Sequence, residues 1–206
     1  MRLPLAPQTG CCAVCARAVE GVEGEYLCED CSGRLRPKYD RAACALRFEG
    51  PARKMVSDFK FNRHLWLRAD LADLAEAAAR SRFDVAAVDV VLPMPTTAFS
   101  RWDRGCNQCE VVGRPLAERL DRRFDAGVLK RRGHPARQSS LDEMARRENV
   151  KGTFRVRRPE MVRGRTVLVV DDILTTGSTL SEAAAALKAC GAARVWAVAL
   201  ARSVRD

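Results

Sequence analysis

The chemically most informative part of the sequence is a pair of adjacent carboxylates, Asp171 and Asp172, followed by a hydroxyl-rich loop. The preceding residues 167–170 are apolar and β-branched, which predicts a short buried strand. The loop at 175–179 reads Thr-Thr-Gly-Ser-Thr and opens a predicted helix, so its N–H groups and hydroxyls can bind one phosphate. Acids beside a phosphate cradle suit ribose hydroxyls that a metal partly neutralises. The segment therefore predicts a site for a sugar phosphate carrying Mg²⁺.

Four cysteines near the N-terminus are spaced as two Cys-x-x-Cys turns and predict a metal site. Cys12 and Cys15 form the first turn, and Cys28 and Cys31 form the second. Four thiolates complete the tetrahedral shell of a structural Zn²⁺ and leave no position for a substrate. So short a segment has too small a core to fold alone, so we expect the metal to stabilise it as a short hairpin. Because Cys11 adjoins a ligand, the spacing leaves open whether Cys11 or Cys12 binds the metal.

A third Cys-x-x-Cys pair, Cys106 and Cys109, lies at the start of a predicted helix. A helix N-terminus can lower the pKa of a thiol, as in thioredoxin-like redox sites. The surrounding sequence offers no second pair that would complete a metal site. We favour the interpretation that both cysteines are packing residues.

The middle and C-terminal parts of the chain alternate between strand and helix patterns, which is typical of an α/β domain with a mostly parallel sheet. We expect a cysteine module over residues 1–40 and the α/β domain over residues 41–206. A proline-punctuated loop that includes Pro95, Thr96 and Thr97 follows one strand and should lie on the ligand face. The predicted strands are 45–48, 85–92, 127–130, 166–171 and 195–200, and the predicted helices are 50–59, 65–80, 107–120 and 178–190.

Charge and hydropathy limit the classes of protein that the sequence can encode. The chain has 206 residues and a formal net charge of +10. Residues 122–165 contain 14 Lys or Arg and five Asp or Glu, a surplus that could meet pyrophosphate or nucleic acid. An ordinary solvated arginine-rich surface would give the same composition. No apolar run reaches the length of a membrane span, and the first ten residues do not form a signal peptide, so we expect a cytoplasmic protein without membrane insertion.

The order of these motifs resembles that of one protein family. The acid pair and the loop at 175–179 match the 5-phosphoribosyl-1-diphosphate (PRPP) motif of type I phosphoribosyltransferases. The cysteine module, Lys60, the segment 91–95, the run Arg-Gly-Cys-Asn-Gln at 104–108 and the spaced residues 137–149 precede it. Over roughly residues 11–203, the chain is similar to the competence-associated ComF/ComFC family, which also includes GntX.

The resemblance implies a role for each matched residue. Asp171 and Asp172 would hold the ribose hydroxyls, directly or through Mg²⁺, and would be the catalytic carboxylates. The 5-phosphate would bind Thr175, Thr176, Gly177, Ser178 and Thr179, and the loop at 93–97 would bind pyrophosphate. The segment 130–154 corresponds to a flexible lid. Basic and lid candidates are Lys60, Arg104, Arg137, Gln138 and Arg147.

Two functions are consistent with that resemblance. The first is a Mg²⁺- and PRPP-dependent transferase with an unknown acceptor, for which the cysteine module is a candidate acceptor-selecting hood. The second is a single-stranded-DNA-binding competence factor with a non-catalytic PRPP fold. The basic segment at 122–165 favours DNA, whereas aromatic residues for base stacking are scarce at 6% of the chain. Other competence proteins are further partners that the resemblance implies.

Overall fold

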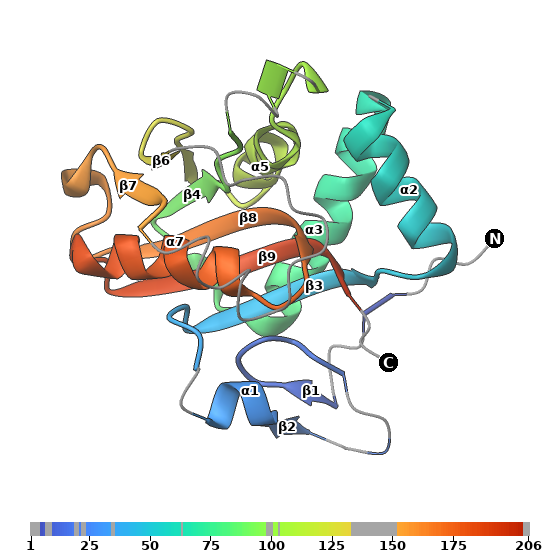
Figure 1. The fold of residues 1–206 in the computed structure, drawn as a ribbon, viewed down its shortest axis with the longest axis horizontal. Helices are drawn as coiled ribbons and strands as arrows, with labels where there is room; N and C mark the ends of the chain where they lie inside the picture. The colour runs from blue at the N-terminus through green and yellow to red at the C-terminus, as the bar shows by residue number, and fades with distance from the viewer. Residues whose placement is uncertain are drawn as a thin grey trace.

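The centre of the molecule is a five-stranded parallel sheet with the strand order β3-β9-β8-β4-β5 (Figure 1). The computed structural model describes residues 5–6, 10–18, 21, 24–33, 36–62, 64–97, 101–102, 104–132 and 152–203. Every pairing within this sheet is parallel, which confirms the predicted fold class. Its strands are β3 (Arg41–Arg47), β9 (Arg194–Arg202), β8 (Thr166–Leu174), β4 (Val90–Pro93) and β5 (Arg123–Phe124).

Helices cover both faces of the sheet, so alternate residues of each strand enter different cores (Figure 1). Val167 and Val169 of β8 pack in the same apolar cluster as α7 (Ser178–Ala189). Leu168 and Val170 pack in a second cluster with the remaining helices. Those helices are α2 (Gly50–Phe61), η1 (Leu65–Leu67), α3 (Arg68–Arg82) and α5 (Gln108–Arg119). Apolar side chains on both faces of one strand are the pattern of a central parallel strand.

The cysteine module packs directly on the main sheet, below β3 in Figure 1. It contains β1 (Cys11–Cys12), β2 (Glu25–Tyr26) and α1 (Glu29–Ser32). Four of its buried cysteines share one apolar cluster with β8, β9 and α7, namely Cys12, Cys15, Cys28 and Cys31. Arg82 of α3 also fastens the module, because its guanidinium donates to the carbonyl oxygens of Cys12 at 3.0 Å and Ala42 at 3.1 Å.

The predicted hairpin in this module is wrong, because β1 and β2 pair in parallel. The chain turns back immediately after β1, where the Cys12 N–H donates to the Arg17 carbonyl at 2.8 Å. Ala18 then forms an antiparallel bridge with Cys11. The chain reverses a second time before β2, so β2 runs in the same direction as β1 and the two strands pair in parallel.

Several predicted element boundaries also change. The expected strand over 85–92 begins only at β4, because Val85–Ala87 form the 3₁₀ helix η2. The Asp84 side chain accepts a hydrogen bond from the Ala86 N–H at 3.1 Å and so favours this turn. β3 begins four residues earlier than predicted, at Arg41, because it pairs with β9 from Trp196 onward. β8 extends past the acid pair to Leu174, because β9 continues beside it to Arg202.

The predicted strand at 127–130 lies outside the main sheet. Instead, β6 (Leu129–Arg131) pairs antiparallel with β7 (Phe154–Val156), while β5 forms the sheet edge. These two short strands lie at the two ends of the segment 130–154, which is the predicted lid. The remaining described element is the 3₁₀ helix η3 (Pro159–Met161). Among the described residues, no helix combines the length and apolar character needed to cross a membrane.

Candidate functional site

A cleft of about 230 Å³ opens at the carboxyl ends of β4 and β8, where parallel sheets bind ligands. The fold brings both predicted acids and most of the predicted phosphate loop to this cleft. Thr97 and Thr176 do not line it, and Arg137, Gln138 and Arg147 lie outside the described residues. The predicted residues that line the cleft are Lys60, Pro95, Thr96, Arg104, Asp171, Asp172, Thr175, Gly177, Ser178 and Thr179.

The acid pair is held by groups from three elements. Lys60, at the end of α2, places its Nζ 2.6 Å from Asp172 Oδ2, and both side chains are largely buried. Asp171 Oδ1 accepts from the Asp172 N–H at 2.9 Å and lies 3.8 Å from the thiol of Cys109. Burial, with a smaller contribution from the charge of Asp172, raises the pKa of Asp171 to about 7. A bound cation would favour the charged carboxylate, so this pair is suited to hold a metal or sugar hydroxyls.

The predicted phosphate loop, residues 175–179, requires a glycine at one position. Gly177 has φ +77° at the N-cap of α7, a conformation that L-residues rarely adopt. A Cβ there would lie 2.8 Å from Tyr39 Oη. The hydroxyls of Thr176 and Ser178 are 2.7 Å apart, and Thr176 Oγ1 accepts from the Ser178 N–H at 3.3 Å. Thr176 therefore stabilises the loop through these internal hydrogen bonds and does not line the cleft. Its neighbours Thr175 and Gly177 line the cleft, next to a helix N-terminus that favours an anion.

Asn107 connects the proline-containing loop after β4 to the start of α5. Its Nδ2 donates to the Met94 carbonyl at 3.0 Å, and its Oδ1 accepts from the Cys109 N–H at 3.1 Å. Gln108 next to it donates to the Lys60 carbonyl at 3.2 Å. Asn107 and Gln108 both stand in the Arg-Gly-Cys-Asn-Gln run, and neither is among the predicted site residues. An asparagine at the start of a predicted helix is a capping signal that could have identified the first of them.

Basic side chains approach the cleft from two further directions. The Arg104 guanidinium lies 5.3 Å from the centroid of the Phe61 ring, and that of Arg131 lies 5.7 Å from the Phe154 ring. The Nε atoms of both arginines are buried and have no hydrogen-bond partner within the described part of the chain. Guanidinium donors left without protein acceptors beside a cleft are suited to a phosphate or pyrophosphate oxygen.

Cys109 is buried next to the acid pair, whereas Cys106 is half-buried. Burial and the two nearby acids raise the pKa of the Cys109 thiol. A raised pKa keeps this sulfur protonated, which is the opposite of the lowered pKa in thioredoxin-like sites. Its environment therefore favours the packing interpretation over a redox role.

The four cysteines of the predicted metal site come together in a buried cluster. The sulfur atoms of Cys12, Cys15, Cys28 and Cys31 all lie within 4.8 Å of one another, and Cys15 Sγ is 3.6 Å from Cys28 Sγ. Tetrahedral Zn²⁺ with Zn–S bonds of about 2.3 Å requires similar sulfur separations, so these residues fit zinc. Cys11 lies outside the cluster and instead accepts a hydrogen bond from Arg82 at 2.7 Å. The geometry therefore favours Cys12 over Cys11.

The parallel sheet, the acid pair and the phosphate loop define the phosphoribosyltransferase class, and residues 107–205 match the phosphoribosyl transferase domain. The DNA utilization protein YhgH of Salmonella typhi is 32% identical, over 98% of this chain and 95% of the relative. Competence protein F of Haemophilus influenzae is 28% identical, over 95% and 92%. The chain therefore belongs to the ComF family of phosphoribosyltransferase-domain proteins, as the sequence motifs predict.

One of the solved structures to which the chain is similar is adenine phosphoribosyltransferase from Saccharomyces cerevisiae. It is 16% identical and has a TM-score of 0.45, and the match covers 70% of this chain and 72% of that one. Glutamine PRPP amidotransferase from B. subtilis is 17% identical with a TM-score of 0.46, over 69% and 30%.

Proposed function

We propose that this protein binds PRPP together with Mg²⁺ and transfers its phosphoribosyl group to an acceptor nucleophile. The observation that supports the proposal is the meeting of an acid pair, a glycine-dependent phosphate loop and three cationic side chains in one cleft. Each group corresponds to one part of this ligand. The loop suits the 5-phosphate, Asp171 and Asp172 suit the ribose hydroxyls, and the cations suit the pyrophosphate.

In the transfer, the bond from ribose C1 to the pyrophosphate oxygen breaks and the acceptor forms the new bond to C1. The leaving pyrophosphate takes the electron pair, so negative charge grows on its oxygens. Arg104 and Arg131 have unpaired Nε donors that would stabilise this charge. Asp171 and Asp172 would hold Mg²⁺, which when bound neutralises phosphate charge. No residue of the described cysteine module lines the cleft, so the proposed acceptor-selecting hood is not formed by that module there.

A panel of partial ligands tests this assignment through their effect on thermal unfolding. PRPP with Mg²⁺ should raise the melting temperature more than ribose 5-phosphate or pyrophosphate, because only PRPP occupies all three parts of the cleft. At a concentration about 100 times Kd, a ligand stabilises the native state by about 2.7 kcal/mol. Equal shifts with pyrophosphate alone would reject a phosphoribosyl site and leave only an anion site.

Affinity for Mg²⁺ and PRPP should depend on pH through Asp171. Because the pKa of Asp171 is raised to about 7, the carboxylate that binds is fully formed only above that pH. Affinity should fall as pH decreases below 7, by up to about tenfold per unit. Stability of the free protein should change in the opposite direction: the native carboxyl holds its proton more tightly than the unfolded one, so stability falls as pH rises from about 4 to 7.

Calorimetry and thermal melts from pH 5.5 to 8.5 measure both effects. Asp171→Asn should remove this component of the pH dependence of the melting temperature, because the amide has nearly the size of the carboxyl group but does not titrate. An unchanged pH profile of stability in the variant would show that another group is responsible.

We also propose single-stranded nucleic acid as a second candidate ligand, on a surface next to the cleft. Phe61, Trp66 and Trp102 are 63%, 69% and 80% exposed, and large exposed rings can stack on bases. A groove of about 690 Å³ is lined by Arg68, by Arg101 and by Arg114, and it shares Asn107 with the cleft. Glu110 in this groove pairs with Arg101 at 2.8 Å and with Arg114 at 3.6 Å, so Arg68 is the groove arginine that forms no ion pair among the described residues. The names of the relatives, DNA utilization protein and competence protein F, are consistent with this candidate.

The aromatic surface gives a direct test of the second candidate. Binding of a single-stranded oligonucleotide should weaken by at least about 30-fold when Trp66→Ala and Trp102→Ala are combined, because stacking contributes about 1–3 kcal/mol per base and two rings are removed. The affinity should also fall steeply with salt. Arg80→Ala on the exposed side of α3 is the control. Fluorescence anisotropy that shows equal affinity for the double variant and wild type would exclude this surface.

A further inference from the structure

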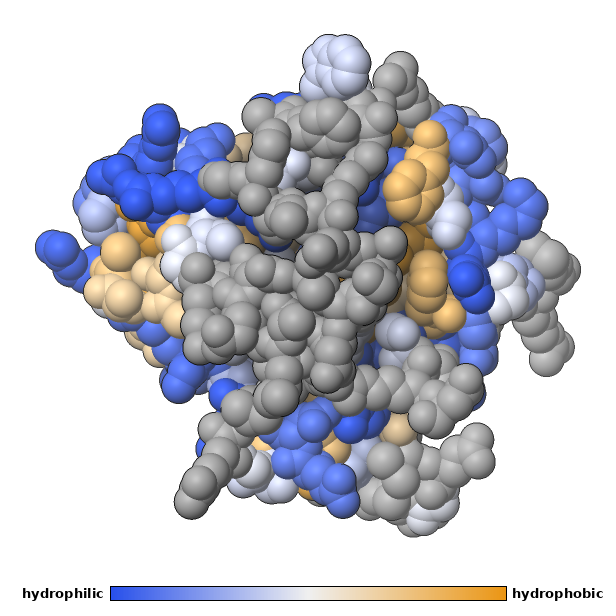
Figure 2. Space-filling view, viewed as in Figure 1, coloured by the Kyte–Doolittle hydropathy of each residue, from blue (hydrophilic) through white to orange (hydrophobic). Residues whose placement is uncertain are grey.

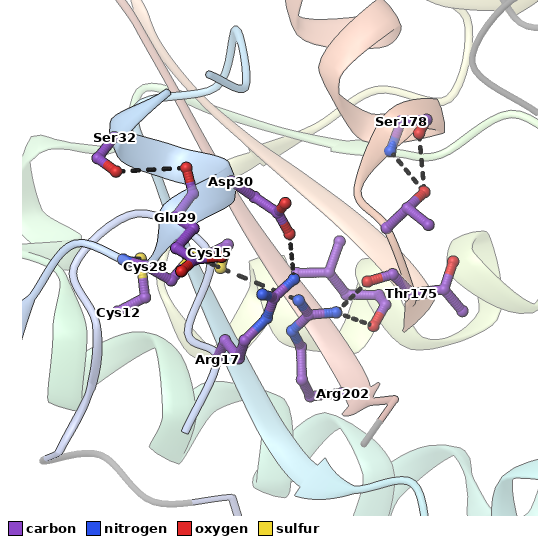
Figure 3. Close-up of polar contacts among 12 residues, drawn as sticks. Cys12, Cys15, Arg17, Cys28, Glu29, Asp30, Ser32, Thr175, Ser178 and Arg202 are labelled. Carbon is purple, nitrogen blue, oxygen red and sulfur yellow. Dashed lines mark hydrogen bonds and ion pairs between the residues drawn. The ribbon is translucent and has the colours of Figure 1, made fainter. Parts of the chain in front are cut away.

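A buried arginine connects the four-cysteine cluster to the phosphate loop. Arg202 is the last residue of β9, and only 6% of it is exposed. Figure 3 shows its guanidinium between Cys15 and Thr175. Nη1 donates to the Leu174 carbonyl at 2.7 Å and also to the Thr175 carbonyl, while Nη2 lies 3.9 Å from Cys15 Sγ. One side chain therefore contacts both the proposed zinc ligands and the start of the phosphate loop.

The contacts of Arg202 set the direction of the loop's peptide groups. In a trans peptide the C=O of one residue points opposite to the N–H of the next. Carbonyls of Leu174 and Thr175 that turn toward Arg202 therefore turn the N–H groups of Thr175 and Thr176 away from it. Orientation of these N–H groups matters because a phosphate loop binds its anion largely through the backbone.

A second buried residue supports the same loop. Tyr39 is 2% exposed and packs in the apolar cluster that contains Cys15 and Cys31. Its hydroxyl faces the Cα of Gly177 closely enough that a Cβ there would lie 2.8 Å away. The cysteine cluster thus supports the predicted phosphate loop at two positions, at Thr175 through Arg202 and at Gly177 through Tyr39.

The charge of Arg202 also requires compensation, because a buried guanidinium is costly without a partner. Within the described ranges, no carboxylate forms an ion pair with it. Four thiolates around one Zn²⁺ carry a formal charge of about −2, and Cys15 presents one of these sulfurs to Arg202. The metal would hold that sulfur in place and so would hold the arginine against the loop carbonyls.

We propose that zinc in the four-cysteine site controls the affinity of the phosphate loop, with Arg202 as the positioning residue that joins the two. This inference rests on the proposed PRPP function, because it concerns the loop that would bind the 5-phosphate. Coupling between two binding sites is reciprocal. Zinc therefore strengthens PRPP binding, and bound PRPP strengthens zinc binding by the same factor.

Two measurements on the full chain test the coupling. The first is the zinc affinity of the protein, measured at equilibrium by competition with a chromogenic zinc chelator, with and without PRPP, at a Mg²⁺ concentration above that of the chelator. The second is calorimetry of PRPP binding to wild type and to Arg202→Met. PRPP should raise the zinc affinity of wild type about tenfold but not that of the variant, which should keep one zinc and bind PRPP about tenfold more weakly.

Arg82→Met is the matched control, because Arg82 is also buried and contacts the cysteine module but makes no contact with the phosphate loop. This variant should bind zinc more weakly than wild type, and PRPP should still raise its zinc affinity. An equal loss of coupling in both variants would assign the effect to general loosening of the module and overturn the role of Arg202.

The outcomes separate this inference from the function on which it rests. Absence of PRPP binding to zinc-loaded wild type rejects the proposed function and the coupling together. PRPP binding with a zinc affinity that PRPP does not change rejects the coupling alone. That second result needs no variant, so it decides the matter even if Arg202→Met does not fold.

Discussion

Replacing Asp171 and Asp172 together with asparagine is expected to abolish Mg²⁺-dependent binding of PRPP. Asparagine keeps the size of each side chain but removes the negative charge that would hold the metal and the ribose hydroxyls. A hydrogen bond to a charged group contributes about 1.5–3 kcal/mol, so loss of both carboxylates should weaken binding by at least about 100-fold. Isothermal titration calorimetry at pH 8, where Asp171 is largely charged, measures the effect.

The single variants should differ in a way that the contacts explain. Asp172→Asn removes the ion-pair partner of Lys60, which lies 2.6 Å away in a largely buried setting. It should therefore lower the melting temperature, since an unpaired buried charge is destabilising. Asp171→Asn removes a carboxylate whose raised pKa shows that burial disfavours its charge, so it should not destabilise the free protein at pH 8. Asp70→Asn, on the exposed side of α3, controls for loss of negative charge alone. If the double variant binds PRPP with unchanged affinity, the acid pair is not part of the PRPP site.

Replacing Cys28 with serine is expected to remove zinc and to destabilise the whole chain. Cys28 is 7% exposed and immediately precedes α1, and its sulfur is one of four within 4.8 Å. Structural zinc contributes an apparent free energy of about 10–16 kcal/mol in isolated zinc fingers, so loss of one ligand should unfold the module. Because the module shares an apolar cluster with β8, β9 and α7, the main domain should also melt at a lower temperature.

Metal analysis by mass spectrometry and a thermal melt test this expectation. Wild type should contain one zinc per chain, and Cys28→Ser close to none. Cys190→Ser is the matched control, because Cys190 is half-buried at the end of α7 and lies outside the cluster. The zinc interpretation fails if wild type is folded and metal-free, or if Cys28→Ser keeps its zinc and its melting temperature.

The parts of the site that lie within one stretch of sequence were predictable. The acid pair, the phosphate loop and the helix behind it occupy consecutive residues of β8 and α7, so local patterns define them. The cysteine spacing likewise predicted the cluster. The contact of Lys60 with Asp172 has no local signal in the sequence, because it depends on how α2 packs at the end of the sheet.

The residues that join distant segments gave no local signal. Arg82 and Arg202 look like ordinary arginines at the ends of a helix and a strand, yet each is buried by the cysteine module. The false strand over Val85–Ala87 arose because apolar periodicity alone does not register the Asp84 side chain that caps a turn. The domain boundary at residue 40, the cytoplasmic location and the competence-protein partners stay predictions.

Calorimetric titration of PRPP into zinc-loaded wild type, with and without Mg²⁺, tests the central claim most directly. Binding of one PRPP per chain with micromolar affinity, about −8 kcal/mol, that disappears without Mg²⁺ is the result expected for the proposed cleft. A folded, zinc-loaded protein that shows no PRPP binding at millimolar ligand would contradict the claim and leave nucleic acid as the remaining candidate ligand.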